Sequence, residues 1–136
     1  MTDARSVVQK HIDAFNARDA AADPWAPDAE LVAPVGTFTG RDAVLGFLAL
    51  FQEAFPDGRQ TVKVLLIDKG AAAAEGVFAG KHDGPLRSPE GDVPPTGRPV
   101  EFRWAPFYEV RGDELASEHL FFDQADFLGQ LGLLRG

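Results

Sequence analysis

Length, composition and charge set the first limits on this protein. The chain has 136 residues, enough for one domain that buries a hydrophobic core. Its 21 acidic and 13 basic residues give a formal net charge of −8, which disfavours nucleic acid and anionic membrane surfaces as partners. The absence of cysteine excludes disulfides and thiolate chemistry, and three scattered histidines disfavour a zinc site.

No segment has the pattern of a membrane span or of a signal peptide. The first residues lack the apolar core of a secretion signal, and no later apolar run approaches membrane-spanning length. We therefore expect a soluble cytoplasmic protein.

The first part of the chain is predicted to contain two helices and a short strand. Apolar residues recur at helical spacing over 3–18, which predicts an amphipathic helix with His11 on its flank. A short helical turn is expected before Pro24, and a strand at about 29–35. The clearest helix covers 41–55, where one apolar stripe comprises Val44, Phe47, Leu48, Phe51 and Phe55.

The remainder is predicted to be mostly strand. We expect strands at about 61–69, 72–81, 100–110 and 114–122, and a closing helix at 124–131. In the first of these strands Val62, Val64 and Leu66 are predicted to share one face. Helices followed by a meander of strands indicate a single α+β domain, 1–136, with N-terminal helices packed on a curved antiparallel sheet.

A long connection rich in glycine and proline separates the middle strands, from His82 to Pro99. Connections of this length inside a compact domain are usually functional or disordered. A plain surface excursion is the alternative interpretation.

Strand 100–110 is predicted to line a cavity with aromatic rings. Its alternation places one set of side chains on a single face: Val100, Phe102, Trp104 and Tyr108. Core packing is the simpler explanation for these rings, but a core with so many rings can also leave space for a flat ligand. Tyr108, the only tyrosine, is a candidate for orienting a carbonyl group.

Asp123 has two possible roles, at the point where the last strand gives way to a helix. As a helix N-cap, its carboxylate would accept hydrogen bonds from backbone N–H groups. As a general acid or base, it would face an aromatic cavity that raises its pKa. Alternation places it on the same face as His119 and Phe121, and a cap residue at a strand end can also border a pocket.

His82 is the second candidate catalytic residue. Glycines on both sides allow close approach of a ligand, and a histidine there could exchange a proton near neutral pH. The alternative is a loop histidine in water or one paired with Asp83.

A second apolar face is predicted opposite the cavity. Phe107, Leu120 and Phe122 fall on it, and an exposed apolar patch of this kind indicates a sheet-to-sheet homodimer. The sequence has no phosphate-binding glycine loop and no Gly-x-Ser-x-Gly elbow, so nucleotide and nucleophilic chemistry have no support.

Several motifs in chain order resemble the SnoaL-like polyketide cyclase family of the NTF2-like superfamily. They are Phe-Gln-Glu-Ala-Phe-Pro-Asp-Gly at 51–58, Glu-Gly at 75–76, Gly-Lys-His-Asp-Gly-Pro at 80–85, Pro-Pro-Thr-Gly-Arg at 94–98, Phe-Asp at 122–123 and Gln-Leu-Gly at 130–132. The resemblance covers nearly the whole chain. It implies a cone-shaped α+β domain around an apolar pocket, usually in a homodimer.

The resemblance also implies residue roles. In the cyclases of this family a pocket aspartate that matches Asp123 promotes an intramolecular aldol closure without metal or cofactor. His82 matches a family histidine that holds or polarises a substrate oxygen. Where many relatives have tryptophan, four residues before the aspartate, this chain has His119, which alters the wall beside the carboxylate.

The leading hypothesis is a cofactor-independent enzyme that acts on a small apolar carbonyl compound. Asp123 and His82 would be catalytic, and the substrate would lie against His119, Trp104, Tyr108, Phe102 and Phe121. A non-catalytic binding or dimerisation module is the alternative from another class. An epoxide hydrolase is a further alternative, because the superfamily includes such enzymes and also ketosteroid isomerases.

Overall fold

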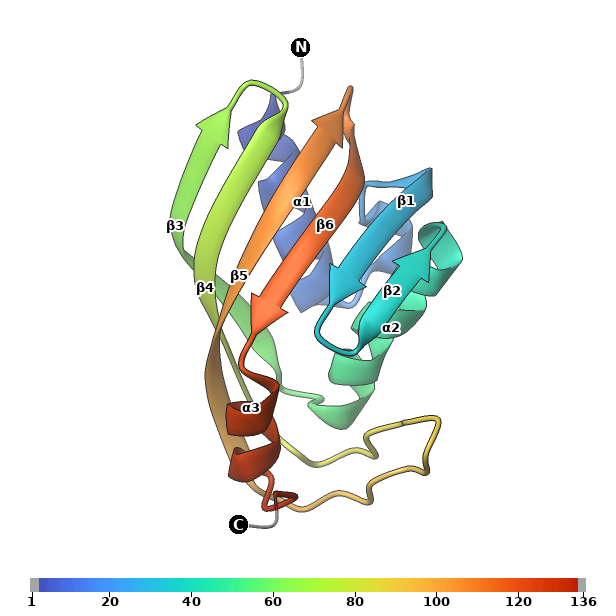
Figure 1. Ribbon diagram of the computed structural model, residues 1–136, viewed down its shortest axis with the longest axis vertical. Coiled ribbons are helices and arrows are strands. Elements are labelled where there is room, and N and C mark those ends of the chain that lie inside the picture. The colour runs from blue at the N-terminus through green and yellow to red at the C-terminus, as the bar shows by residue number, and fades with distance from the viewer. Residues whose placement is uncertain (1–2, 135–136) are drawn as a thin grey trace.

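Three α-helices pack on a curved six-stranded sheet in the computed structural model, which describes residues 3–134 (Figure 1). The helices are α1 (Ala4–Ala17), α2 (Arg41–Ala54) and α3 (Gln124–Gln130), with a short 3-10 helix, η1, at Ala20–Ala22. The strands are β1 (Trp25–Ala33), β2 (Gly36–Thr39), β3 (Arg59–Asp68), β4 (Ala71–Lys81), β5 (Pro99–Arg111) and β6 (Glu114–Phe122). This confirms the predicted cone-shaped α+β fold.

The sheet is mixed and open. Its strands lie in the order β2-β1-β6-β5-β4-β3, and each neighbouring pair is antiparallel except β1 and β6, which run parallel. The expectation of a wholly antiparallel sheet is therefore wrong at one ladder. The two strands of this parallel ladder, β1 and β6, come from opposite ends of the sequence.

The predicted elements match the observed ones closely, with one strand missed. The unpredicted strand is β2, which has four residues, three of them exposed, and so carries almost no burial pattern. Strand β1 begins at Trp25, earlier than expected, although Pro27 lies within it. The register between β1 and β6 shifts between Trp25 and Glu30, and such an irregularity accommodates the missing N–H of a proline.

A register shift in β3 overturns the predicted face of that strand. The pairing of β3 with β4 is irregular between Val62 and Val64, so the alternation changes phase there. Val64 and Leu66 are exposed, whereas Leu65 and Ile67 pack against the core. A regular alternation, as assumed from the sequence, could not reveal this change.

The core is a cluster of aromatic rings between the helices and the concave face of the sheet. Phe127 on α3 joins the cluster, with ring centroids 5.8 Å from Phe51 on α2 and 5.2 Å from Phe102 on β5. The side chain of Gln130 fixes α3 further, since it accepts from the backbone N–H of Glu101 and donates to the Glu101 carbonyl. The last helix thus closes one end of the cone.

The long connection after β4 is held at its base and near its tip. The backbone N–H of His82 donates to Arg98, and Leu86 and Val93 form an isolated β-bridge. Arg87 forms ion pairs with Glu53 on α2 and with Asp92. None of the helices within residues 3–134 is long and apolar enough to cross a membrane.

Candidate functional site

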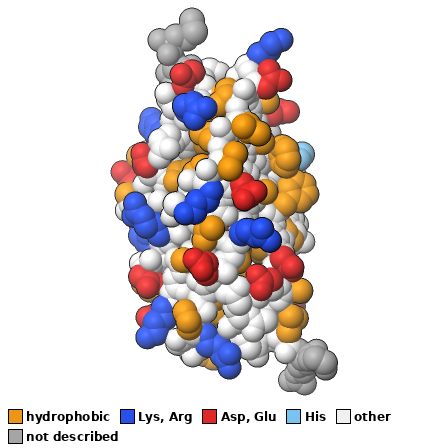
Figure 2. Space-filling model, turned by 90° about the vertical axis from the view of Figure 1, so that its left-hand side faces the viewer, with side chains coloured by type: hydrophobic (Ala, Val, Ile, Leu, Met, Phe, Trp, Pro, Cys, Tyr) orange, Lys and Arg blue, Asp and Glu red, His pale blue; other side chains and the backbone are white. Residues whose placement is uncertain are grey.

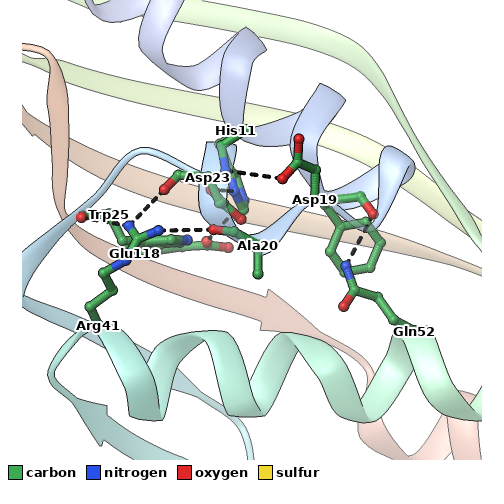
Figure 3. Close-up of polar contacts among 10 residues, drawn as sticks. His11, Asp19, Ala20, Asp23, Trp25, Arg41, Gln52 and Glu118 are labelled. Atoms are coloured by element: carbon green, nitrogen blue, oxygen red, sulfur yellow. Dashed lines mark hydrogen bonds and ion pairs between the residues drawn. The ribbon is translucent and has the colours of Figure 1, made fainter.

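A buried polar cluster of His11, Asp23 and Glu118 lies between α1, the start of β1 and β6 (Figure 3). His11 Nδ1 is 2.8 Å from Asp23 Oδ1, and His11 Nε2 is 3.7 Å from Glu118 Oε1. All three side chains are at most 4% exposed. An imidazole therefore stands between two carboxyl groups inside the core.

Local sequence explains how each group reaches this position. His11 belongs to the buried face of α1, together with Val7, Val8, Ile12 and Phe15. Asp23 ends the η1 turn, directly before Pro24. Glu118 points to the concave face of β6 because it alternates with outward-facing neighbours, and Tyr108 lies opposite it on β5.

Glu118 is also one wall of an aromatic cavity of about 30 Å³. A cavity of this volume has room for about one or two water molecules. Its lining comes from α1, α2 and the concave face of the sheet. The lining residues are Phe15, Phe47, Leu48, Phe51, Gln60, Phe78, Phe102, Trp104, Glu118, Leu120 and Phe122. Glu118 is the only ionisable side chain in this lining.

Burial and mutual charge shift the protonation equilibria of the cluster. Desolvation raises the pKa of Glu118 to about 7; the nearby His11 lowers it and Asp23 raises it. Burial disfavours the charged form of His11, but the charge and hydrogen bond of Asp23, with the charge of Glu118, outweigh it and raise the pKa of His11. Desolvation also raises the pKa of Tyr108, so its phenol stays protonated.

Two polar atoms at the cavity have no hydrogen-bond partner among residues 3–134. They are Glu118 Oε1, which lies 3.7 Å from His11 Nε2, and the indole Nε1 of Trp104, both buried. Buried polar groups are normally paired, so such atoms mark places where a water or ligand fits. One is an acceptor or acid and the other a donor.

The structure brings some of the predicted binding residues to this cavity. Phe102 and Trp104 line it, as their strand alternation predicted. Tyr108 is buried beside the polar cluster, with its ring centroid 5.9 Å from that of His11.

The expected face of the last strand is wrong. Glu118, Leu120 and Phe122 point inward, so His119 and Phe121 point outward on the convex face, where Phe121 is 57% exposed. The predicted apolar patch is corrected accordingly, since Phe121 and not Leu120 or Phe122 lies beside Phe107 there.

Asp123 is exposed and caps α3. Its Oδ1 accepts from the backbone N–H of Asp126 at 2.9 Å, and its backbone is extended, as an N-cap requires. The capping half of the prediction thus has direct geometric support. Asp123 does not line the aromatic cavity, and its catalytic role stays a prediction.

His82 is fully buried at the base of the long connection rather than in the cavity lining. Its Nδ1 accepts from the backbone N–H of Thr96 at 3.1 Å and lies 2.9 Å from the Thr96 hydroxyl. Its ring packs on Phe55, and burial lowers its pKa. This geometry anchors the connection, and the proposed contact of His82 with a substrate stays a prediction.

Sequence reasoning missed the polar cluster. His11 lies in the apolar stripe of its helix, and this position indicates burial. Its predicted place on the flank of the helix is therefore wrong. The inward direction of the Glu118 side chain follows from the sequence only if the alternation of the last strand is reversed, with Glu118, Leu120 and Phe122 on the concave face. Asp23 had no signal beyond its place before Pro24, because its partner lies on another element.

Comparison with known proteins identifies the family. The family model of the SnoaL-like domain matches residues 8–119. The chain belongs to the SnoaL-like family. This confirms the resemblance inferred from the sequence motifs.

Solved structures of similar shape agree with this SnoaL-like assignment. IdmH, a putative polyketide cyclase from Streptomyces antibioticus, is 27% identical with a TM-score of 0.81, over 96% of this chain and 99% of that one. A putative SnoaL-like polyketide cyclase from Jannaschia sp. CCS1 is 15% identical with a TM-score of 0.84, over 96% and 92%.

A third structure, from Catenulispora acidiphila DSM 44928, has a ketosteroid isomerase-like fold and was solved in complex with trimethylamine. It is 21% identical with a TM-score of 0.75, over 94% of this chain and 93% of that one. A search of curated proteins gives no match.

The raised pKa of Glu118 predicts a stability difference that depends on pH. A carboxyl group with a pKa of about 7 when folded and 4.5 when unfolded binds its proton more tightly in the folded protein. The contribution of Glu118 to the free energy of unfolding is therefore greatest below pH 4.5. It is lost as pH rises through 7, by up to about 3 kcal/mol. Urea unfolding between pH 5 and 8 should show a steeper loss of stability in the native protein than in Glu118→Gln.

The titrating groups that do not contact Glu118 cancel in this difference, whereas Glu118→Gln also removes the part of the His11 pKa shift that the charge of Glu118 causes. The raised pKa of His11 acts in the same direction, and the lowered pKa of His82 acts in the opposite one. Parallel stability curves for the two proteins would contradict the buried, protonated state of Glu118.

The capping role of Asp123 predicts unequal effects of two substitutions. Asp123→Ala should lower the free energy of unfolding by about 1 kcal/mol, because the N–H of Asp126 loses its acceptor. Asp123→Asn should leave stability nearly unchanged, since asparagine caps about as well as aspartate. Thermal unfolding of both variants measures this, and equal losses would argue against the cap.

Proposed function

We propose that this protein is a cofactor-independent acid/base enzyme of the SnoaL-like type, acting on a small apolar carbonyl compound, with Glu118 as its proton-transfer group. The observation that carries the proposal is the Glu118 carboxyl group, which is buried, lines an aromatic cavity and has no hydrogen bond at Oε1, the atom 3.7 Å from His11 Nε2. A carboxyl group with a pKa near 7 can both accept and release a proton at neutral pH. Asp123, exposed beside α3, remains the alternative proton-transfer group proposed from the sequence.

The chemistry that fits best is proton removal from a carbon next to a carbonyl. The ionised carboxylate of Glu118 would take the proton, and the electron pair of the broken C–H bond would form an enolate. Attack of the enolate carbon on a second carbonyl of the same molecule gives aldol cyclisation. Return of the proton to a different carbon gives isomerisation.

Trp104 supplies a donor for the enolate oxygen. Its indole N–H is buried without a partner, and its side chain lines the same cavity as Glu118. A donor already in place in a site of low polarity stabilises developing negative charge without reorganisation. Protonated His11, held by Asp23, lies beside Glu118 and offsets its charge when the carboxyl group ionises.

The lining of the cavity indicates the substrate class. Seven aromatic rings and two leucines surround Glu118, with Gln60 as the one further polar side chain. A neutral, flat and apolar compound suits these walls, whereas an anionic substrate would meet the Glu118 carboxyl group in a lining that contains no cationic side chain.

Ligand entry requires the cavity to widen. Pockets for small organic ligands typically measure roughly 300–1,000 Å³, far more than the 30 Å³ of this cavity. Phe51 on α2 and Phe122 on β6 are only half-buried and meet edge to face, with centroids 6.2 Å apart. Separation of these two rings is the route by which we expect a ligand to reach Glu118.

Two alternatives have a specific observation in their favour. A protein of similar fold was solved in complex with trimethylamine, which favours a binding module that performs no chemistry. A water-sized cavity beside a buried carboxyl–imidazole network fits an epoxide hydrolase. The description of IdmH as a putative polyketide cyclase supports carbonyl chemistry instead.

A proton-exchange assay tests the proposal without knowledge of the natural substrate. Incubation of 1-tetralone, a flat apolar ketone, in D₂O reports deuterium uptake next to the carbonyl by NMR. Glu118→Gln should slow the catalysed exchange by at least about a hundredfold, the usual effect of losing a general base. The native rate should rise through about pH 7, because only the ionised carboxylate accepts the proton.

Asp123→Asn is the matched comparison, since it also replaces one carboxylate by an amide. The proton-exchange rate of Asp123→Asn should equal that of the native protein. Loss of exchange in Asp123→Asn but not in Glu118→Gln would show that Asp123, and not Glu118, is the proton-transfer group. Tight binding of the ketone with no exchange above the buffer rate would favour the binding module.

We also propose a homodimer formed through the convex face of the sheet. The convex patch consists of Leu66, Ala73, Phe107, His119 and Phe121; the first four are consecutive partners across strands β3 to β6. Leu66, Phe107 and Phe121 are more than half exposed, and the rings of Phe107 and Phe121 contact edge to face. Figure 2 shows this face edge-on at its right, where hydrophobic side chains gather.

A single charge in the patch should separate the dimer. Phe121→Glu should convert the protein from two copies to one in light scattering after size exclusion, because a desolvated charge opposes association. Val35→Glu is the matched control, since Val35 is 54% exposed but lies on the turn between β1 and β2. A native protein that elutes as a monomer at high concentration would contradict the dimer.

A further inference from the structure

Arg41, the first residue of α2, binds three backbone carbonyls of the segment that precedes and begins β1. Its Nη1 donates to the carbonyls of Asp23 at 2.7 Å and Trp25 at 2.9 Å, and its Nη2 donates to that of Ala20 at 2.8 Å (Figure 3). The side chain is half-buried. A planar guanidinium fork can satisfy several acceptors in one fixed geometry, which an ammonium group cannot reproduce.

The segment that Arg41 holds carries Asp23 to His11. Within residues 20–25 the backbone makes two short local bonds, from the Asp23 N–H to the Ala20 carbonyl and from the Trp25 N–H to the Asp23 carbonyl, and the Pro24 carbonyl accepts one bond from the Leu115 N–H on β6. Arg41 binds the carbonyls of Ala20, Asp23 and Trp25, so it holds the segment on both sides of Pro24. The position of the Asp23 carboxylate therefore depends on this side chain together with the single bond to β6.

We propose that Arg41 is the positioning residue of the candidate site: by holding the 20–25 segment it keeps the Asp23 carboxylate against the His11 ring, and so determines how the proton is shared between His11 and Glu118. The inference rests on the proposed function, since it assigns Arg41 a part in the same proton-transfer site. Arg41 has no hydrogen bond to His11 or Glu118, so it acts through the backbone rather than on the reacting atoms.

The groups that face His11 come from each element packed around it. Asp23 contacts Nδ1, and Glu118 on β6 faces Nε2. The rings of Trp25 on β1 and Tyr108 on β5 lie at centroid distances of 5.1 and 5.9 Å. Of these, Asp23 is the charge in hydrogen-bond contact, so its displacement should change the titration of His11 most.

Arg18 offers a matched control within the same chain. Its guanidinium also donates to three backbone carbonyls, those of Asn16, Phe55 and Pro56, at 2.8–3.0 Å. These carbonyls belong to the end of α1 and the turn after α2, away from Asp23. Arg18→Gln therefore removes the same number of hydrogen bonds as Arg41→Gln but leaves the 20–25 segment in place.

The test follows the ring of His11 by NMR titration of the whole protein in the native form and in both variants. The chain has only three histidines, and His11→Gln identifies the signal of interest. Arg41→Gln should lower the titration midpoint of His11 by about one unit or more, because the nearby carboxylate that favours the imidazolium is released. Arg18→Gln should leave the midpoint unchanged.

An unchanged His11 midpoint in Arg41→Gln, or an equal shift in both variants, would overturn the proposal. If Arg41→Gln does not fold, Arg41→Lys replaces it: it keeps the charge without the fork, and the midpoint must still fall. The titration needs no substrate, so the His11 midpoint can be measured even if the protein proves to have no catalytic activity. In an active protein, the pH at which proton exchange is half-maximal should move in Arg41→Gln and not in Arg18→Gln.

Discussion

The burial of one carboxyl group beside an imidazole organises this structure more than any other contact. Glu118 lies on the concave face of a central strand, where a hydrocarbon side chain would pack without cost. An unpaired charge there would be strongly unfavourable, so the group either stays protonated or ionises beside a neighbour that compensates its charge. His11 and Asp23 supply the neighbour from two further elements. The sheet, α1 and the segment before β1 must therefore meet in one arrangement.

The aromatic core serves the same group in another way. Phenyl rings fill the concave space without offering polar partners, so the few polar atoms among them stay unsatisfied or pair with each other. This arrangement keeps the medium around Glu118 apolar and maintains its shifted pKa.

Most of the fold followed from periodicity, and most of the site did not. Helix and strand positions depend on local alternation, which the ring-rich strand β5 shows in full. Phase is less secure: the irregular pairing after Val62 moved residues of β3 to the unexpected face, and β6 alternates regularly but in the opposite phase to the prediction. The parallel neighbours β1 and β6 could not be predicted from either strand alone. Asp23 joins the site only through that tertiary arrangement, so its role had no local sign.

The pairing of β1 with β6 has a consequence for how the chain acquires its structure. The second half of the sheet is a run of sequential hairpins, which can form as soon as their strands are available. Strand β1 pairs on one edge with β2, which follows it directly in the sequence, but its other edge must wait for β6. During synthesis that edge stays unpaired until residues 114–122 are available. Non-local pairing of this kind slows folding and prolongs the exposure of an unpaired strand edge.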